Sequence, residues 1–499
     1  MTGQARQPSH PSEEDLSSED APEEDTYQSS NRFKRIWHYA HRKIPAIVSD
    51  PNYTKRLAVY RRSDVKKNLR TEPPADEVID LLCVWAIEFY PPSHIEKLRT
   101  GFSKLGWDDG NAGLHDSPTQ WIRQLRESSM GGDWFNLGVI ERDGVEHFFG
   151  HQRTATLPAN VEYAIGSLYG LTPSITCIVM CFVLTEEHSC SFDQILRKKY
   201  QTKITPTRDR RGYRIYSPTQ QKLAEIGFVR ESIRKSSADW FRAYLPGLFS
   251  SGLLKSEVPT CEFVTFKKGH PFPKVQDGAG PEKYLRLLDM DYSAEAWESV
   301  DISGLKFAWP MLRDSETGFH AVIAMNEEDI DKGNLKAYGE EDDRSSYVTC
   351  VNEHVNELLS RWSLLAVLSG FERHLNATRD SAIFQPGGRQ KPERLLETLT
   401  ALLTQSGDIS AASSDLAQFV KHKGMFSDEM AAFKPCNLRS YQDENTELGE
   451  TLRHTIAERS AWIHYADKSV RDLVTQYGNS VSALENIRLQ KWRIQLRSA

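Results

Sequence analysis

Residues 78–90 read VIDLLCVWAIEFY, an apolar and aromatic run that is followed at once by two prolines. This composition is typical of a buried β-strand, which the prolines end. Two further apolar runs, at 161–171 and 174–184, are separated by Thr172-Pro173 and predict two more strands. The three runs together indicate a β-sheet in the first half of the chain.

Helices and a hairpin are predicted between these strands. Ser93 follows the two prolines and is expected to cap the N-terminus of a helix over 94–105. A second helix is expected over 118–127. The dipeptide Asp143-Gly144 is a strong hairpin signal, with flanking strands at 135–141 and 145–149. The order strand, helix, hairpin, strand predicts one mixed sheet with helices on one face.

Residues 191–325 continue this body less regularly. A helix is expected over 218–243, with Leu223 among the apolar residues available for packing. Strands are expected near 261–266, 305–309 and 319–325.

The last third of the chain has a helical pattern. Between 345 and about 379 there is no proline, and apolar residues recur every three or four positions. Within 445–496, the positions from Ile463 to Ile494 form an a/d seam of coiled-coil type over more than four heptads. The seam fits two arrangements, antiparallel packing on the 345–379 helix and self-association in trans. Two shorter helices are expected at 393–404 and 415–422.

The predicted fold class is therefore α+β. An N-terminal mixed β-sheet body with helices is followed by a helical C-terminal region with long antiparallel coiled-coil-like helices. The expected domains are an acidic tail at 1–30, a basic aromatic arm at 31–72, the α+β body at 73–325, an acidic loop at 326–344, and a helical domain at 345–499.

Charge divides the N-terminal region into two blocks of opposite sign. Residues 1–30 hold eight acids and one base, which accounts for the whole formal net charge of −7. A segment so rich in Ser, Pro and Glu is expected to be disordered. Residues 31–72 hold twelve bases and three acids, interleaved with aromatic residues such as Trp37. This mixture suits phosphate contact with base stacking, and it equally suits an arm that packs its aromatic residues on the body.

A second basic segment, RKKYQTKITPTRDRRGYR at 197–214, holds eight bases and one acid. Its Pro206 and Gly212 predict a loop or an irregular hairpin. Four guanidinium groups within seven residues repel one another unless acids or a polyanion balance them. The predicted anion-binding residues are Lys203, Arg208, Arg210, Arg211 and Arg214.

The segment 326–343 has the opposite character, with eight acids and two lysines. A solvated acidic loop is expected there, and a cation site is the alternative.

The seven cysteines are odd in number and widely spaced, and no secretory signal precedes them. These features predict reduced thiols and a cytoplasmic protein. No apolar run approaches the roughly 18–20 residues that a membrane-spanning helix needs. Cys177 and Cys181 lie on one predicted strand about 13 Å apart, too far to share a zinc ion, and are expected in the core.

Two segments carry metal-ligand residue types. Glu146, His147 and His151 lie in EHFFGHQR, where His at i and i+4 could bind zinc on a helix. The glycines and the Phe pair instead predict strand and turn, which would separate the imidazoles. Glu353-His354-x-x-Glu357 lies on a predicted helix but does not match HExxH, and a solvated polar face explains it. No metal site and no cofactor are therefore predicted.

Sequence motifs of several large enzyme classes are absent. The chain contains no G-x-x-x-x-G-K-[ST] nucleotide loop, no G-x-G-x-x-G after a strand, no G-x-S-x-G nucleophile elbow and no kinase signature set. Ser and His are plentiful, so a triad assembled in space stays open.

The helical C-terminal region resembles, in its last fifty or so residues, the cytosolic stalk of CorA-type magnesium transporters and related bacterial membrane-proximal proteins. The resemblance rests on the long amphipathic helix that ends in SVSALENIRLQKWRIQL at 480–496. The chain departs from that family because no transmembrane segment follows and the Gly-Met-Asn motif is missing. The resemblance implies a membrane-proximal soluble part, and transport by this chain alone is excluded.

The sequence thus favours a non-catalytic intracellular interaction or regulatory protein that binds a protein partner or self-associates. An alternative is an enzyme that acts on a phosphate-bearing or nucleic-acid substrate. In that case the 197–214 loop would bind the anion, and acid–base groups would come from Glu146, His147, His151, Glu186, Glu187 and His188. A third interpretation is a membrane-surface adaptor that uses the 31–72 arm.

Overall fold

The structure is a computed structural model that describes residues 36–37, 39–40, 53–108, 117–127, 131–143, 153–206, 213–252, 254, 256–273, 283–292, 295–309, 319–329, 344–383, 407–427, 430–436 and 446–498. The chain divides into two compact units. The smaller unit comprises Met1–Glu72 and Arg197–Ala224, and the larger unit comprises Pro73–Leu196 and Glu225–Ala499. The predicted tail at 1–30 and most of the acidic loop lie outside the described residues.

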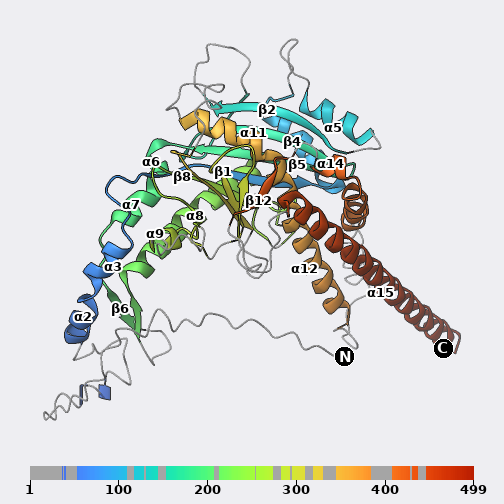
Figure 1. Ribbon diagram of the computed structural model, residues 1–499. Coiled ribbons are helices and arrows are strands. Elements are labelled where there is room, and N and C mark those ends of the chain that lie inside the picture. Colours follow the sequence, from blue (N-terminus) through green and yellow to red (C-terminus); the bar gives the residue numbers. More distant parts are fainter. Residues whose placement is uncertain are drawn as a thin grey trace, which may run out of the picture. The chain divides into compact units, whose positions relative to one another are not determined.

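The larger unit is built on a mixed sheet (Figure 1). Its described strands are β1 (Ile79–Tyr90), β2 (Asp133–Arg142), β3 (Arg153–Ala155), β4 (Val161–Thr172), β5 (Ile175–Leu184), β8 (Thr260–Phe266), β9 (Ala296–Ser299), β10 (Lys306–Ala308), β11 (His320–Asn326) and β12 (Phe433–Pro435). They lie in the order β12-β9-β10-β11-β8-β1-β5-β4-β2-β3. The β11–β8 and β2–β3 pairs are parallel and the other pairs are antiparallel, which confirms the predicted mixed sheet.

The strands predicted from the three apolar runs lie side by side at the centre of this sheet. β1 pairs with β5 from Cys83 opposite Val183 to Tyr90 opposite Thr176, and β5 pairs with β4. Almost every residue of β1 and all of β5 are buried. The first strand of the predicted Asp143-Gly144 hairpin is β2, whereas its second strand lies outside the described residues.

The described helices are α4 (Ile95–Lys104), α5 (Pro118–Glu127), α6 (Glu186–Ser189), α7 (Ser191–Arg197), α8 (Pro218–Tyr244), α9 (Lys283–Leu287), α11 (Arg344–Trp362), α12 (Leu364–Ile383), α14 (Lys423–Ser427) and α15 (Leu448–Ser498). A short 3₁₀ turn, Pro92–His94, precedes α4. The helices expected at 118–127 and 218–243 are confirmed as α5 and α8. Leu223 of α8 is exposed instead of packed.

Helices cover both faces of the central strands, so the prediction of helices on one face is wrong. Trp85 of β1 donates its indole N–H to Asn352 Oδ1 of α11 at 2.9 Å. Trp85 lies opposite Cys181, so the next residue, Phe182, points to the other face. There Phe182 packs edge-on against Trp240 of α8. Figure 1 shows α8 and α11 on opposite sides of the sheet. Burial on both faces explains why β1 and β5 are apolar without alternation.

The expected capping of α4 by Ser93 is also wrong. Ser93 lies inside the 3₁₀ turn, and the residue at the N-cap of α4 is His94, whose side chain makes no capping hydrogen bond. The Ser93 hydroxyl instead donates to Asp408, a residue 315 positions away. The Ser93 hydroxyl, which the local pattern predicts as the helix cap, is thus bonded to a carboxylate that is distant in sequence.

The helix expected over 345–379 is two helices, because α11 ends at Trp362 and α12 begins at Leu364. The Ser363 hydroxyl donates to the Ser360 carbonyl at 3.1 Å, and such bonds compete with the helical ladder. α15 packs on α12, and Arg459 forms a bidentate ion pair with Glu372 at 3.0 and 2.7 Å. A further helix includes the described residues 407–419 and overlaps the helix expected at 415–422 in its first five residues only. The helix expected at 393–404 lies outside the described residues.

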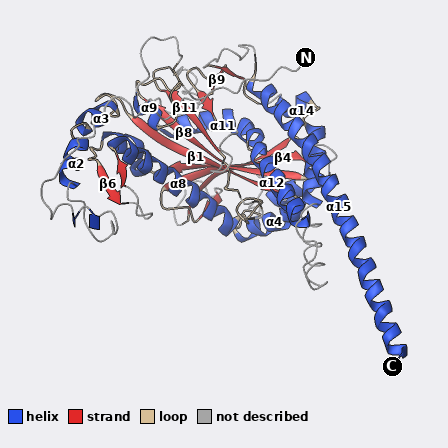
Figure 2. Cartoon of the chain, turned by 90° about the horizontal axis from the view of Figure 1, so that it is seen from below, coloured by secondary structure: helices blue, strands red, loops and turns tan. Residues whose placement is uncertain are grey.

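The buried stripe of α15 includes the first residues of the predicted seam. Ile463 and Val470 are buried, as are Leu452 and Ile456 before them. The seam side chains from Leu473 onward lie outside those described. The C-terminal half of α15 extends away from the rest of the larger unit (Figures 1 and 2).

The sequence predicts neither a membrane-spanning helix nor disulfide bonds, and the described residues bear on both. None of the helices described is both long and apolar enough to cross a membrane. All seven cysteines are free thiols, and Cys177 and Cys181 are buried in β5 as predicted.

The described elements of the smaller unit are α2 (Tyr53–Arg61), α3 (Asp64–Arg70), β6 (Lys203–Pro206), β7 (Tyr213–Tyr216) and the first residues of α8. β6 and β7 form a two-stranded antiparallel ribbon. The hairpin expected within 197–214 is therefore confirmed, although its tip at 207–212 lies outside the described residues.

Candidate anion-binding surface

The smaller unit contains both basic segments found in the sequence, the arm ending at Glu72 and the segment from Arg197. Among the residues that the structure describes in this unit, thirteen are Lys or Arg and two, Asp64 and Glu72, are acids. Segments separated by more than a hundred residues thus combine their positive charge in one compact body.

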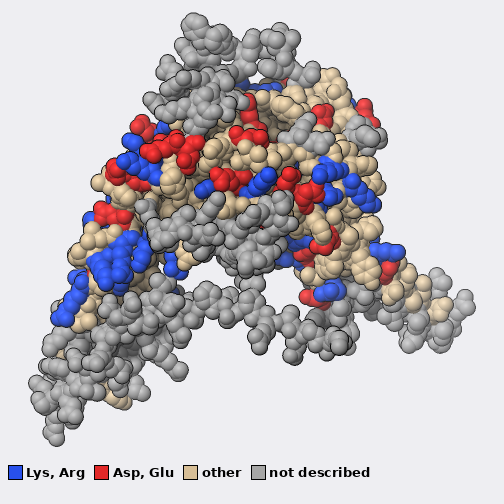
Figure 3. Space-filling model, in the orientation of Figure 1, with Lys and Arg blue, Asp and Glu red and all other residues tan. Residues whose placement is uncertain are grey.

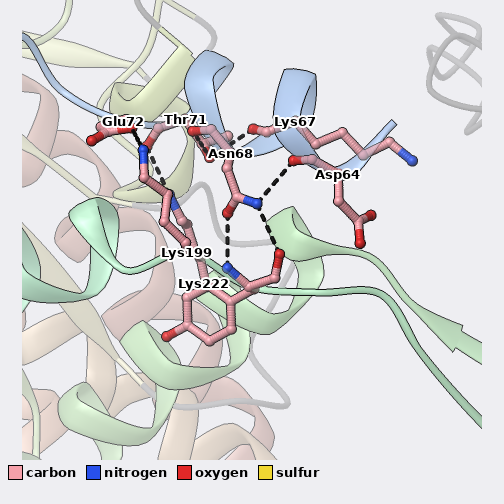
Figure 4. Close-up of polar contacts among 8 residues, drawn as sticks. Asp64, Lys67, Asn68, Thr71, Glu72, Lys199 and Lys222 are labelled. Atoms are coloured by element: carbon pink, nitrogen blue, oxygen red, sulfur yellow. Dashed lines mark hydrogen bonds and ion pairs between the residues drawn. The ribbon is translucent and has the colours of Figure 1, made fainter. Parts of the chain in front are cut away.

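Two polar side chains of α3 hold the second basic segment. Asn68 is buried, and its amide N–H donates to the Tyr200 carbonyl at 2.8 Å and to the Asp64 carbonyl at 2.8 Å. The Tyr200 N–H donates back to Asn68 Oδ1 at 3.0 Å. The primary amide therefore pairs with both backbone polar groups of one residue, Tyr200, in the way that a neighbouring β-strand would (Figure 4).

Asp64 lies one turn before Asn68 on the same face of α3. Its carboxylate accepts the Thr202 N–H at 2.7 Å and the Thr202 hydroxyl at 2.5 Å. Because Asp64 is buried and accepts these hydrogen bonds, its negative charge lies inside the unit and not on its surface. We call the contacts of Asp64 and Asn68 with Tyr200 and Thr202 the α3 clamp.

The other described acid is also engaged within the unit. Glu72 forms an ion pair with Lys199 (Figure 4). Lys222 lies nearby, fully buried, and donates to the Thr71 carbonyl at 3.4 Å. Burial lowers the pKa of Lys222 to about 8; the charge of Glu72 raises this pKa, and that of Lys199 lowers it. The interior of the unit therefore adds a further positive charge at neutral pH.

Two of the predicted anion-binding residues lie on one exposed face of the β6–β7 ribbon. Lys203 pairs with Tyr216, and Thr205 pairs with Arg214. Residues opposite one another share a face, and so do residues two apart on one strand. Lys203 and Arg214 are thus diagonal neighbours, and both are exposed. Ile204 and Ile215 point to the opposite face.

The face of α3 that turns away from the clamp is basic as well. Lys66 and Arg70, four residues apart, are both exposed. Val65 and Leu69 beside them are 70% and 61% exposed. Figure 3 shows Lys and Arg side chains gathered over α3. We call Lys66, Arg70, Lys203 and Arg214, together with the other exposed bases of the unit, the basic surface.

The remaining predicted site residues are only partly covered by the structure. Arg208, Arg210 and Arg211 lie outside the described residues, as do Glu146, His147 and His151, so their roles stay predictions. His188 is described on α6, where its Nδ1 atom lies 2.9 Å from the Thr185 hydroxyl. Glu186 and Glu187, beside it, are exposed.

The second metal candidate of the sequence is engaged in other contacts. His354 Nε2 lies 2.7 Å from the Ser299 hydroxyl, and burial lowers the pKa of His354. Glu357 forms an ion pair with Arg361. Within the described part of the chain, no group of three or more His, Cys, Asp or Glu side chains is arranged to hold a metal ion.

The α3 clamp and Lys222 are the parts of this site that sequence reasoning missed. A signal for the clamp was present, since Asp64 and Asn68 are polar residues at i and i+4 spacing among the bases of the arm. No local signal marks Lys222, which lies beside Leu223 on the same helix and is buried while Leu223 is exposed. Comparison of the chain with protein-family models and with curated proteins found no match to either.

Proposed function

We propose that this chain is an interaction protein whose smaller unit binds the phosphate backbone of a nucleic acid through the basic surface. The observation that carries the proposal is the union of two distant basic segments in one unit whose described acids are both engaged internally. Lys and Arg side chains that neutralise backbone phosphates supply the sequence-independent part of nucleic-acid affinity.

Aromatic residues among the bases favour nucleic acid over a simple anion. Trp37 and Tyr39 are 40% and 65% exposed, and Tyr216 lies on the same ribbon face as Lys203 and Arg214. Aromatic rings that neighbour basic groups suit the stacking of unpaired bases. A single-stranded nucleic acid is therefore the partner that we propose.

A second candidate is an anionic lipid surface. The exposed Val65 and Leu69 on α3 favour it, because apolar side chains ringed by bases can insert among lipid headgroups. The resemblance of 480–496 to a membrane-proximal stalk points to the same location. This candidate is an outcome of the experiment below and would replace the first.

The test is a binding titration of the full chain with a fluorescent single-stranded oligonucleotide over a range of salt concentrations. In the test variant, Lys66, Arg70, Lys203 and Arg214 are all replaced by Gln. If each base contacts one phosphate, the slope of log K against log salt becomes shallower by about 3, at roughly 0.7 per contact. The matched control replaces four exposed bases of the larger unit: Lys104, Arg123, Lys421 and Lys468.

The expected result is weaker binding and a shallower slope for the test variant, and parent-like binding for the control. Equal losses in the two variants would mean that net charge alone matters, and the basic surface would not be a site. Binding to vesicles that contain phosphatidylserine, without binding to the oligonucleotide, would overturn the nucleic-acid proposal in favour of the lipid surface.

For the C-terminal helix, we propose that α15 continues its a/d seam beyond Val470 as a coiled coil with another helix. The extension of α15 away from the larger unit supports this, because an amphipathic helix gains most of its stability from packing. A concentration-dependent mass in light scattering tests it, and a constant monomer mass would reject self-association.

A further inference from the structure

A chain of polar contacts links four residues of the larger unit that are distant in sequence. Ser251 Oγ lies 3.2 Å from His94 Nε2, and His94 Nδ1 lies 2.8 Å from Ser93 Oγ. The Ser93 hydroxyl donates to Asp408 Oδ2, and the Ser93 N–H donates to Asp408 Oδ1 at 3.2 Å. We call this chain the Ser251 relay.

The direction of the hydrogen bonds follows from the number of protons available. An ionised carboxylate can only accept, so the single hydroxyl proton of Ser93 points to Asp408. Ser93 Oγ must then accept the proton of His94 Nδ1. A neutral imidazole carries one N–H, which leaves His94 Nε2 as the acceptor that faces the hydroxyl of Ser251.

The environment of His94 favours the neutral imidazole. His94 is only 4% exposed, and burial lowers its pKa, with Lys97 acting in the same direction and Asp408 opposing both. At the other end of the relay lies Arg126, which is half-buried; burial lowers the pKa of its guanidinium, and the charge of Asp408 opposes this. The Nε and Nη2 atoms of Arg126 make no hydrogen bond among the described residues.

Ser251 itself is exposed and lies on a turn whose backbone is hydrogen-bonded to the end of β1. Glu88, fully buried on β1, accepts the N–H groups of Phe249 and Ser250 at 2.9 and 2.8 Å. The Leu248 N–H donates to the Phe89 carbonyl at 2.8 Å. The end of β1 therefore holds the serine turn, and the same strand leads through the two prolines to His94.

We propose that the Ser251 relay is a hydrolytic site for carboxylic esters, with Ser251 as nucleophile and His94 as general base. Ser251 Oγ attacks the ester carbonyl carbon while its proton passes to His94 Nε2. The carbon–oxygen bond to the alcohol then breaks, and His94 returns the proton to the departing alkoxide. Water attacks the acyl-serine with His94 again taking a proton, which releases the carboxylic acid and restores Ser251.

Ser93 and Asp408 are positioning residues in this proposal, since they act through His94. They hold the imidazole in the tautomer that presents an unprotonated Nε2 to Ser251. The activity goes beyond the nucleic-acid binding proposed above and rests on different residues in a different unit.

The experiment uses the full chain, a fluorophosphonate probe and p-nitrophenyl acetate. We expect the probe to label Ser251, as located by mass spectrometry, and Ser251→Ala to lose both labelling and hydrolysis. His94→Gln is expected to slow both by about 100-fold or more, the usual contribution of a general base. Ser103→Ala, an exposed serine elsewhere in the larger unit, is the control and keeps the parent activity.

Ser93 provides the test that a merely structural network would not pass. In the parent, the labelling rate rises with pH as His94 loses its proton, with a midpoint below that of an ordinary histidine because burial lowers the pKa of His94. Ser93→Ala is expected to lower the rate and shift this midpoint, and Ser93→Thr, which keeps the hydroxyl, is expected to restore both. Should His94→Gln fail to fold, these two variants and Ser251→Ala decide the question.

Three results would overturn the proposal. The first is a parent chain that neither reacts with the probe nor hydrolyses the ester. The second is labelling at a serine other than Ser251. The third is labelling of Ser251 at the same rate in His94→Gln or Ser93→Ala, which would show that the relay does not activate Ser251.

Discussion

Replacing Asn68 by Ala removes the centre of the α3 clamp and leaves the surface charges in place. The substitution deletes the hydrogen bonds to the C=O and the N–H of Tyr200, at 2.8 and 3.0 Å, and the bond to the Asp64 carbonyl. Tyr200 is 8% exposed, so water does not readily replace the lost partners. Each buried polar group that loses its partner costs about 1–3 kcal/mol, so the two groups of Tyr200 together cost roughly 2–6 kcal/mol.

The assay is hydrogen–deuterium exchange of the full chain, followed on peptides that cover 198–204. Opening of this segment exposes its amides, and each 1.4 kcal/mol changes the opening equilibrium tenfold. A cost of about 2–6 kcal/mol therefore speeds exchange there by roughly 30-fold to 20,000-fold. Leu69→Ala is the control, since Leu69 is 61% exposed and lies beside Asn68 on α3.

The same variant separates charge from assembly. Asn68→Ala keeps every Lys and Arg, yet we expect weaker oligonucleotide binding and a shallower salt slope, because the two basic segments are no longer held together. Parent-like exchange at 198–204 would show that the clamp does not hold the segment. Fast exchange with unchanged binding would show that the union of the segments is irrelevant to the partner.

Three further predictions concern buried groups of the two units. The pKa of Lys222 is lowered to about 8 in the folded state, so above pH 8 the folded chain loses this proton while the unfolded chain keeps it. The free energy of unfolding therefore rises by about 3 kcal/mol between pH 8 and 10.5. Chemical denaturation of Lys222→Met is expected to lack this rise. Burial raises the pKa of Glu88 to about 7, and its hydrogen bonds to the backbone and to Ser250 oppose this shift. Because the folded state binds this proton more tightly, the free energy of unfolding falls by about 3 kcal/mol between pH 4.5 and 7. Glu88→Gln is expected to remove this pH dependence. Ile463→Asp places a charge at a buried position of α15 and lowers the free energy of unfolding by several kcal/mol, whereas Trp462→Asp, at a position that is 46% exposed, changes it little; equal melting temperatures for the two variants would contradict the packing of this face of α15.

Local patterns predicted the long central strands and several of the helices correctly. The apolar runs gave β1, β4 and β5, and helix α5 begins and ends where the sequence placed it. A strand with one covered face alternates apolar and polar residues, whereas the runs of β1 and β5 do not alternate. Their continuous apolarity indicates two covered faces, which is why the prediction of helices on one face is wrong. The break at Ser363 carries no Pro or Gly, so the helical pattern alone does not reveal it.

The candidate sites were predictable only in part, because both depend on contacts between distant residues. Charge counting found both basic segments, but only the fold brings Tyr200 against Asn68, 132 positions away. The Ser251 relay left no motif at all, since Ser93 and Asp408 are 315 positions apart. The local pattern around Ser93 instead predicts a helix cap, because Ser is a preferred N-cap residue.

The two candidate sites are built in the same way, and this similarity explains what the buried polar groups do in this protein. In each, a buried side chain on a regular element accepts the backbone N–H groups of a distant loop: Asn68 and Asp64 for the 200–202 segment, and Glu88 for the turn before Ser251. Burial raises the pKa of Glu88, which means that its charged form is costly inside the unit. A hydrophobic core would stabilise the fold without that cost, but it would not fix one loop in one register. Positioning of the basic segment and of the serine turn is therefore what these buried groups supply.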